Sequence, residues 1–238
     1  MKDYCVTGRN ASREMVRSGR ALTLYVLKRL SGDSVVTEAK EKGIPVRFCE
    51  DPELSRIAKT SSHQGFVSVV EPFEPVPLKQ LLQQAKSKQN PLILMLDGIE
   101  DPNNLGAIMR SADAFGVAGI IMKKRGEVPL NETVARVSTG AIAYVDVAVV
   151  SNLSQAISEC KDSGFWIVSS DGSATMGYQE VDYHCPIVLV VGSEGFGISK
   201  NVLGHSDFIV KIPMVGHVNS LNASVATGIL LSYVALNR

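Results

Sequence analysis

The stretch IPMVGHVNSLNASVATGILL, residues 212–231, is the most informative part of this chain. The polar residues His217, Asn219, Ser220 and Asn222 stand directly before a segment of helix length that is apolar or small almost all round. A helix without a polar face is normally buried, so the polar residues at its start lie inside the protein or in a cleft. The stretch therefore predicts a buried final helix that begins at a site, with Ser220 as a plausible N-cap.

Two earlier segments repeat this arrangement, because each places a polar loop after a short apolar run of strand length. The run LILML (92–96) precedes DGIEDPNNLGAIMRSADAFGV (97–117), and IVLVV (187–191) precedes GSEGFGIS (192–199). In open α/β sheets, ligands bind where loops leave the carboxyl ends of the strands. We therefore expect the three polar loops to converge on one crevice.

Strand-like runs rich in Val and Ile alternate with helix-like segments along most of the chain. We expect strands at 21–27, 45–50, 65–71, 92–96, 119–122, 146–150, 165–170, 187–191 and 208–214. We expect helices at 10–18, 35–42, from 52, 104–115, 131–138 and from 153, a short helix between the last two strands, and a helix at the end of the chain. After residue 91 this alternation predicts an α/β domain with a largely parallel sheet covered by helices on both faces. Before residue 71 it predicts a second, small α/β module.

A proline-rich stretch, residues 71–90, separates the two parts and predicts a linker of limited flexibility. The expected domains are therefore 1–70 and 91–238. Residues 1–90 hold 15 Lys and Arg against 10 Asp and Glu, a net charge of +5, which leaves −5 for the rest. A basic module favours a polyanion such as RNA as its partner, although an ordinary solvated surface explains the same modest excess.

The cysteines, the histidines and the apolar runs exclude several classes of protein. The four cysteines lie far apart without a CxxC pair, and the four histidines have no metal-ligand spacing. The first twenty residues are basic without an apolar segment, and no later run has the length of a membrane span. We therefore expect a cytoplasmic protein with reduced thiols, no metal and no membrane segment.

The loop and helix at 97–117 present an arginine away from the core. The buried stripe predicted from helical spacing comprises Leu105, Ile108, Met109 and Ala112. Arg110 lies well off this stripe and therefore projects outward. Two interpretations are open from these residues alone. Either the asparagines at 103 and 104 only cap the helix and Arg110 is a solvated charge, or Asn104 and Arg110 belong to a site.

The loop at 192–199 places a carboxylate among glycines. Gly192, Gly195 and Gly197 permit a positive φ and the close approach of a ligand to the backbone. The pattern is neither GxGxxG nor a P-loop, so it supports neither a dinucleotide nor a nucleoside triphosphate. Glu194 stands between these glycines at the carboxyl end of a strand, where it would lie in the crevice, although a glycine-rich turn is more often only a turn.

The order and the residues of the three polar segments resemble the motifs of the SpoU family of RNA ribose methyltransferases, in the knotted SPOUT class. The resemblance implies a deep trefoil knot in the C-terminal domain and a homodimer with its sites near the interface. It implies a reaction centre at the matching positions, which are Asn104, Arg110, Glu194, Ser220 and Asn222. In this family the arginine takes the proton of the ribose 2′-hydroxyl or stabilises the alkoxide, and a guanidinium with a pKa above ~12 rarely gives up its own proton.

The resemblance also implies S-adenosylmethionine as the cofactor, held mostly by backbone groups of the same loops. The matching positions are Gly192, Ile212 and Leu221. Methyl transfer from a sulfonium requires no metal and no covalent intermediate, but it requires the 2′-oxygen in line with the methyl carbon and help with its proton. The reactive carbon belongs to the cofactor, and the protein contributes geometry and electrostatics.

The N-terminal module is similar to the small domain of the ribosomal-RNA members of the family, which resembles RNA-binding ribosomal proteins. GRN at 8–10 and HQGFVSVV at 63–70 look like the start and the end of that domain. The candidate RNA contacts are Arg9, Asn10, Arg13, Arg17 and Arg20. Phosphate contacts of this kind set the register of the RNA, and its 2′-hydroxyls distinguish it from DNA.

The resemblance implies that the substrate is ribosomal RNA. The expected reaction is 2′-O-methylation of a ribose in large-subunit (23S) RNA, at a guanosine of the peptidyl-transferase region. The alternatives are a thiostrepton-resistance-type enzyme that modifies an adenosine of that RNA, a transfer-RNA 2′-O-methyltransferase, and an RNA-binding ribosome-assembly factor without catalysis. The target nucleotide and the form of the substrate, naked RNA or an assembling particle, stay open at this point.

Overall fold

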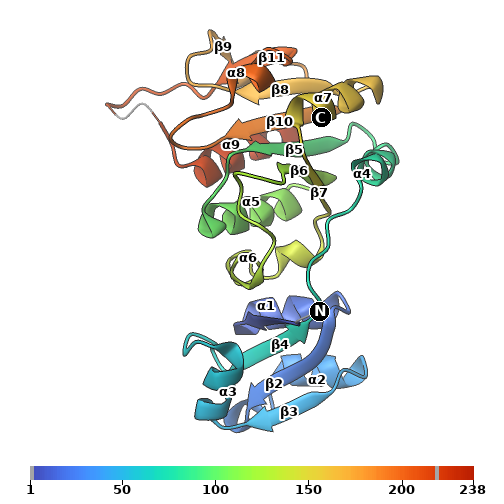
Figure 1. The fold of residues 1–238 in the computed structure, drawn as a ribbon, viewed down its shortest axis with the longest axis vertical. Coiled ribbons are helices and arrows are strands. Elements are labelled where there is room, and N and C mark those ends of the chain that lie inside the picture. Colours follow the sequence, from blue (N-terminus) through green and yellow to red (C-terminus); the bar gives the residue numbers. More distant parts are fainter. Residues whose placement is uncertain (1–2, 218–219) are drawn as a thin grey trace. The chain divides into compact units, whose positions relative to one another are not determined.

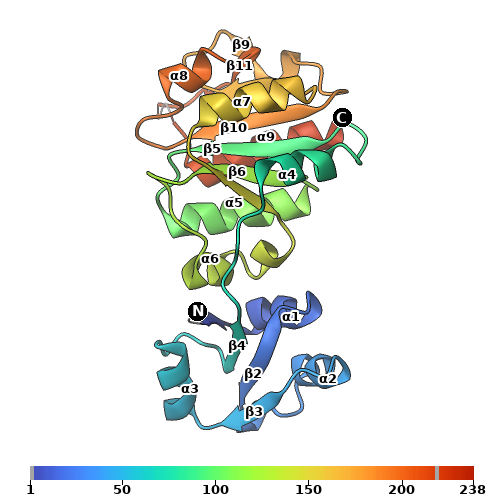
Figure 2. The same ribbon diagram turned by 45° about the vertical axis from the view of Figure 1, so that its right-hand side comes forward.

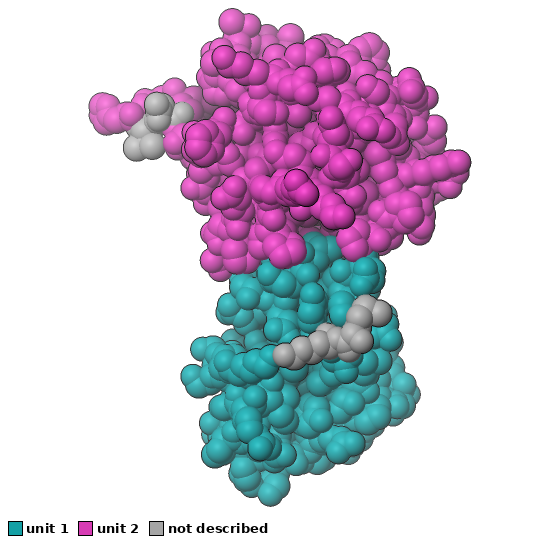
Figure 3. Space-filling view, viewed as in Figure 1, with its two compact units in different colours: residues 1–74, 130–144 teal, residues 75–129, 145–238 magenta. Residues whose placement is uncertain are grey.

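The computed structural model describes residues 3–217 and 220–238, which form two compact units (Figure 1; Figure 3). Unit 1 comprises the chain up to Glu74 together with Leu130–Tyr144, and unit 2 comprises Pro75–Pro129 and Val145–Arg238. Asn219, one of the polar residues before the final helix, lies outside the described residues. Within those ranges, no helix has the length and apolar character needed to cross a membrane.

Unit 1 is built on a four-stranded sheet with the order β1-β4-β2-β3 (Figure 2). The strands are β1 (Tyr4–Thr7), β2 (Ala21–Leu27), β3 (Val46–Cys49) and β4 (Phe66–Val70), connected by the helices α1 (Arg9–Arg17), α2 (Ser34–Glu41) and α3 (Asp51–Ala58). Strand β4 is antiparallel to β1 and β2, whereas β2 and β3 are parallel. The sequence predicts all of these elements except the short strand β1.

Residues 130–144 belong to unit 1, although the sequence groups them with 91–238. This segment contains α6 (Glu132–Val137) and a 3₁₀ turn (Ala141–Ala143). Glu132 Oε1 accepts the backbone N–H of Cys5 at 2.6 Å, and the Tyr144 hydroxyl donates to Glu14 Oε2 at 2.8 Å. Long-range contacts of this kind leave no periodic signal in the sequence, so the compact units differ from the boundaries expected from it.

Unit 2 contains a seven-stranded parallel sheet with the order β7-β6-β5-β10-β8-β11-β9. Its strands are β5 (Leu92–Asp97), β6 (Gly119–Lys123), β7 (Val147–Val150), β8 (Trp166–Ser170), β9 (Met176–Gly177), β10 (Ile187–Gly192) and β11 (Phe208–Lys211). Its helices are α4 (Leu78–Ala85), α5 (Pro102–Ala114), α7 (Leu153–Asp162), α8 (Lys200–Leu203) and α9 (Ala223–Leu236). The predicted α/β fold is therefore confirmed, and the trefoil knot stays a prediction.

The core of unit 2 lies on both faces of this sheet. Ile93 and Met95 of β5 share one hydrophobic cluster with Leu81 of α4 and Ile157 of α7. The intervening leucines of β5 point to the opposite face and are also fully buried, and α5 and α9 pack against each other. Because Leu81 is buried in this core, α4 is part of unit 2, although it lies in the stretch 71–90 expected as a linker.

The register of the sheet brings two of the three polar loops together. Strands β5 and β10 are neighbours, and Asp97 is paired with Gly192. Both strands therefore end at the same edge of the sheet, and the Ser193 N–H donates to the Asp97 carbonyl oxygen at 3.1 Å. This edge is the crevice that the sequence predicts.

Candidate active site

Three segments that are far apart in the sequence meet at Asn104, Glu194 and Asn222, which we call the amide–carboxylate cluster. Asn104 Nδ2 donates to Glu194 Oε1 at 3.0 Å. Asn222 Nδ2 donates to the same carboxylate oxygen and, at 2.9 Å, to Asn104 Oδ1. The backbone N–H of Ala223 also donates to Glu194 Oε1, at 3.3 Å. One carboxylate oxygen therefore connects α5, the loop after β10 and the start of α9.

Helix α5 presents Asn104 to the cluster and Arg110 to solvent. Asp101 caps the helix by accepting the Asn103 N–H at 3.0 Å, so the Asn104 amide is not used as a cap. Arg110 is exposed, as its place off the apolar stripe predicts. It follows Asn104 by ~9 Å along the helix axis, and it lines neither cavity of this site. The structure therefore does not bring Arg110 into the amide–carboxylate cluster.

Helix α9 begins at Asn222, and this residue has two functions. Asn222 Oδ1 caps the helix by accepting the N–H groups of Ser224 and Val225 at 3.0 and 3.3 Å. Its Nδ2 meanwhile belongs to the cluster. The prediction of Ser220 as the N-cap is wrong. The N-cap is Asn222, two residues later, because its side chain accepts these two N–H groups of the first turn.

Gly192 is required by the protein's own backbone. A Cβ at this position would lie 2.1 Å from the carbonyl carbon of Gly197, because the loop folds back in a bridge between Ser193 and Gly197. Of the three glycines in the loop, only Gly197 has a positive φ, 63°. The glycines therefore shape a tight loop that presents Glu194 and Phe196 outward.

A cavity of about 230 Å³ lies beside the cluster, and it contains all three positions expected to hold the cofactor, Gly192, Ile212 and Leu221. Glu194 and Ser220 also line it. The remaining wall combines apolar side chains with polar groups, namely Val191, Met214, Ala226, Ser170 and Asp171. Such a mixture suits a ligand with an apolar ring and charged ends.

A second cavity, of about 460 Å³, shares Ser193, Glu194, Gly197 and Ala223 with the first. Asn104, Lys123 and Phe196 line only this second cavity. The amide–carboxylate cluster therefore stands at the border of two adjoining cavities, where groups bound in each would meet.

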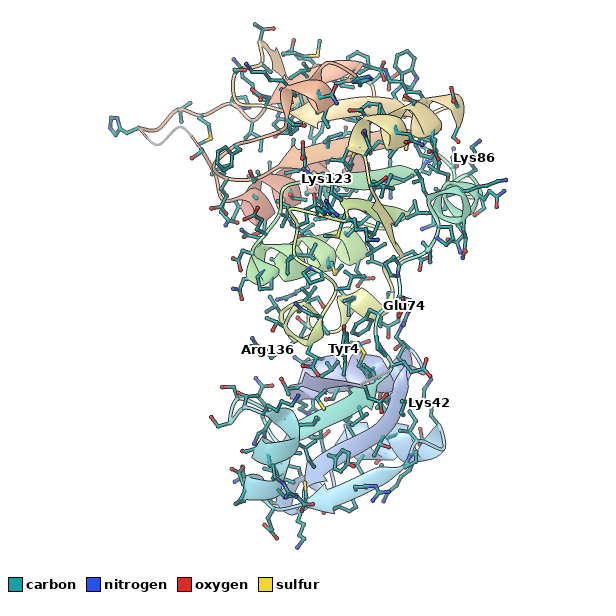
Figure 4. All side chains as sticks on the ribbon, viewed as in Figure 1. Tyr4, Lys42, Glu74, Lys86, Lys123 and Arg136 are labelled. Atoms are coloured by element: carbon teal, nitrogen blue, oxygen red, sulfur yellow. The ribbon has the colours of Figure 1, made fainter. Side chains whose placement is uncertain are left out.

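A buried acidic network supports the second cavity, and the sequence interpretation missed it. Lys123, labelled in Figure 4 at the end of β6, donates from Nζ to Asp97 Oδ1 at 2.6 Å, and the Ser199 N–H donates to Asp97 Oδ2 at 2.9 Å. Burial alone would raise the pKa of Asp97, but these bonds outweigh it and hold the pKa below its ordinary value. The available signal was an aspartate that directly follows the apolar run of β5.

Glu127 completes this network. Its carboxylate accepts the backbone N–H groups of Gly98 and Lys123, each at 2.9 Å. Burial raises the pKa of Glu127 to about 7 in spite of these bonds. Across the described residues, no group of three or more His, Cys, Asp or Glu is placed to hold a metal ion.

In unit 1, most of the arginines expected to contact RNA are paired with acids of the neighbouring helix. Arg9 Nε lies 2.8 Å from Asp33 Oδ2, and Arg13 and Arg17 both form ion pairs with Glu38. The Arg20 guanidinium lies over the Phe73 ring, 5.6 Å from its centroid. Asn10 is exposed and lines a separate cavity of unit 1. The paired arginines thus stabilise the packing of α1 on α2, and their contact with RNA stays a prediction.

Comparisons with known proteins identify the class of protein to which this sheet and this cluster belong, namely the RNA methyltransferases. The SpoU rRNA Methylase family matches residues 91–232. The family described as RNA 2′-O ribose methyltransferase substrate binding matches residues 5–76. The chain belongs to the SpoU rRNA Methylase family.

Relatives and solved structures extend the similarity over nearly the whole chain. A putative TrmH family tRNA/rRNA methyltransferase of Staphylococcus aureus (strain COL) is 40% identical, over 100% of this chain and 98% of that protein. The AdoMet-bound rRNA methyltransferase from Sinorhizobium meliloti has a TM-score of 0.81 and 25% identity, over 98% of this chain and 86% of its own. The TrmH/SpoU tRNA-modifying enzyme of A. aeolicus, 35% identical with a TM-score of 0.58, covers 68% of this chain and 82% of its own.

Proposed function

We propose that this protein is an S-adenosylmethionine-dependent 2′-O-methyltransferase that modifies a guanosine ribose in the peptidyl-transferase region of 23S ribosomal RNA, in the cytoplasm. The observation that supports the reaction most strongly is the amide–carboxylate cluster at the border of two cavities. One cavity receives the cofactor and the other receives the target nucleotide, so that methyl donor and acceptor meet beside Glu194.

The first cavity fits S-adenosylmethionine by the chemistry of its walls. Backbone groups at Gly192, Ile212 and Leu221 would hydrogen-bond the adenine and ribose, while Val191 and Met214 supply apolar contact. The carboxylates of Asp171 and Glu194 would balance the positive charges of the cofactor. When bound, the cofactor supplies an electrophilic methyl group on a sulfonium.

The protein's own residues position the ribose. Asn104, Asn222 and the Ala223 N–H saturate Glu194 Oε1, whereas Oε2 accepts no hydrogen bond from the described residues. Glu194 is exposed, so Oε2 is free to accept a ribose hydroxyl and to hold the 2′-oxygen toward the first cavity. Ser220, on the wall of the first cavity, offers a further hydroxyl at the same border.

Arg110 has the role of stabilising the developing alkoxide, since its guanidinium donates five N–H groups and retains its charge. It stands ~9 Å along α5 from Asn104, so the substrate must bring the ribose toward the outer face of this helix or a second subunit must complete the site. A homodimer is part of the proposal. Val225 and Leu236 on α9 are 49% and 81% exposed and offer an apolar surface for the second copy.

The N-terminal module supports ribosomal RNA as the substrate. Residues 5–76 match the substrate-binding family, and the structure of an rRNA methyltransferase covers 98% of the chain, whereas that of a tRNA-modifying enzyme covers 68%. The adenosine-modifying alternative has the same two-part layout, and a map of the modified nucleotide distinguishes the two. A binding factor without catalysis has no need of the complete amide–carboxylate cluster.

Methyl transfer from labelled S-adenosylmethionine to unmodified large-subunit RNA and to transfer RNA tests the proposal, with the product mapped by primer extension sensitive to 2′-O-methylation. We expect one ribose stop at a guanosine of the large-subunit RNA. A stop at an adenosine would favour the thiostrepton-resistance type, and labelling of transfer RNA alone would change the substrate. Cofactor binding without methylation of either RNA would contradict the proposed function.

A further inference from the structure

Phe196 is far more exposed than the other aromatic residues on the surface. Its side chain, in the loop after β10, is 97% exposed, whereas Phe48, Tyr144 and Trp166 are between 39% and 49% exposed. Burying an aromatic ring normally stabilises a protein, so a ring held in solvent on a loop of the active site indicates a partner from outside the chain.

The loop holds this ring at the edge of the second cavity. Phe196 lines that cavity together with Asn104 and Glu194, and its backbone N–H donates to Ser193 Oγ at 3.3 Å. The bridge between Ser193 and Gly197 closes the loop that carries the ring. The cavity has a volume of about 460 Å³. A nucleoside is a ligand of suitable size.

The polar wall of the cavity indicates what kind of partner enters. Lys123 is held by Asp97, and its side chain is 30% exposed, so its ammonium keeps donors for a ligand. Ser199 and Glu194 add further polar groups. A second copy of the chain packed over Phe196 would remove water from the remaining Lys123 donors and from Glu194 Oε2, which is costly. A nucleotide instead combines a flat apolar face with many acceptors.

We propose that Phe196 is the stacking platform for the base of the target nucleotide, and that Lys123 donates to an acceptor of the same nucleotide. The inference rests on the proposed function, because it requires the ribose to enter beside Glu194. Unstacked bases in RNA bind to aromatic side chains through their faces, and such stacking tolerates any base. Phe196 therefore positions the nucleotide, and other contacts determine which base is accepted.

Phe196→Ala, Phe196→Tyr and a control, Trp166→Ala, test this inference in the full-length protein. We expect Phe196→Ala to lower kcat/KM for large-subunit RNA roughly 5- to 100-fold, with unchanged thermal stability and cofactor affinity, because the exposed ring supports no packing. Phe196→Tyr keeps the ring and should keep most of the activity. Trp166 is a half-exposed aromatic at the amino end of β8, away from the site, so Trp166→Ala should leave kcat/KM unchanged.

A second measurement separates this inference from the proposed function. Phe196→Trp in a Trp166→Phe background contains one tryptophan, at the loop, because the chain has a single native one. We expect its fluorescence to be quenched when unmodified large-subunit RNA binds, whether or not methyl transfer occurs. Unchanged fluorescence on RNA binding, or a wild-type kcat/KM in Phe196→Ala, would overturn the stacking. A loss of dimer mass in Phe196→Ala by light scattering would overturn it too, in favour of a subunit contact.

Discussion

The arginine face of α1 and the amide–carboxylate cluster contain residue types that suggest function equally well, but their surroundings differ. Arg9, Arg13 and Arg17 form ion pairs with acidic residues of α2 and its N-cap, in the same unit. Asn104 and Asn222, which are 118 residues apart in the sequence, meet at a carboxylate whose second oxygen accepts no hydrogen bond from the described residues. Side chains that satisfy each other locally stabilise a fold, whereas side chains gathered from distant loops with an unused acceptor indicate a site.

The largest effect should come from breaking the cluster. Asn222→Ala removes the donor that binds both Glu194 and Asn104, and it also removes the cap of α9. We expect kcat for RNA methylation to fall roughly 100-fold, because misplacing a positioned group by ~1 Å has an effect of that size. Single-turnover kinetics at saturating cofactor measure it.

The matched control is Asn152→Ala, which removes the asparagine that caps α7. A lost cap costs about 1 kcal/mol of stability, and this one contacts neither cavity of the site. We expect near-normal kcat in the control. Equal losses of kcat in the two variants would show that Asn222 acts only as a cap.

Gly192→Ala should have the next largest effect. Its Cβ would overlap the backbone of Gly197, so the loop after β10 must shift. We expect a destabilisation of ~1–3 kcal/mol, together with a weaker affinity for S-adenosylmethionine. Thermal unfolding and calorimetric titration measure these. Gly195→Ala is the control for stability, because nothing lies within 4 Å of a Cβ there, and equal unfolding temperatures for the two variants would contradict the close packing.

Unit 2 should lose stability as the pH rises toward neutrality, because of Glu127. Burial raises its pKa to about 7, above the ordinary value of 4.5, so the folded state favours the protonated form. The contribution is complete below pH 4.5 and is lost as the pH rises through 7, with an upper limit of about 3 kcal/mol. Asp97 acts in the opposite sense at lower pH. Because its pKa is lowered in the folded state, its contribution to stability is present above the ordinary pKa of an aspartate and is lost as the pH falls.

The variant Glu127→Gln isolates this effect. We expect it to be less stable than the native chain at neutral pH, since one of the two backbone N–H groups loses its acceptor. Between pH 4.5 and 7, the free energy of unfolding of the variant should fall less with rising pH than that of the native chain, because glutamine does not titrate. Chemical denaturation at several pH values measures this. If the free energy of unfolding changed with pH in the same way in the variant and in the native chain, the role of Glu127 would be contradicted.

The smallest effect concerns the arginine face. Glu38→Gln releases Arg13 and Arg17 from a partly exposed carboxylate, so we expect a loss of stability below ~1 kcal/mol. If these arginines contact phosphates, the variant should bind RNA a few-fold more tightly, with a steeper dependence on salt. Filter binding over a series of salt concentrations measures it. An unchanged affinity and slope would assign the arginines to the fold alone.

The sequence predicts the elements of this fold well, because apolar runs and glycine stops are local signals. Strand β2 and the exposed position of Arg110 are examples. Strand β1 and the docking of residues 130–144 in unit 1 depend on contacts between distant segments, which leave no period in the chain.

The candidate site divides in the same way. Asn104, Glu194 and Asn222 follow strand-like runs, so their convergence could be predicted from the edge at which parallel strands end. The roles of Lys123, at the end of β6, and of Glu127, in the loop after it, could not be predicted, because a single charged residue shows in the sequence neither its burial nor its partner. The N-cap of α9 could not be predicted either, because Ser220 and Asn222 are both suitable capping residues and lie only two positions apart.

We propose that Glu194 holds the ribose while the two amides hold Glu194. Single-turnover methyl transfer to large-subunit RNA by Glu194→Gln, at saturating S-adenosylmethionine and RNA, tests it most directly. We predict a rate lowered roughly 100-fold, because the amide that replaces the carboxylate presents a donor to the donors of Asn104 and Asn222 or to the ribose hydroxyl. A rate equal to that of the native chain would contradict the claim.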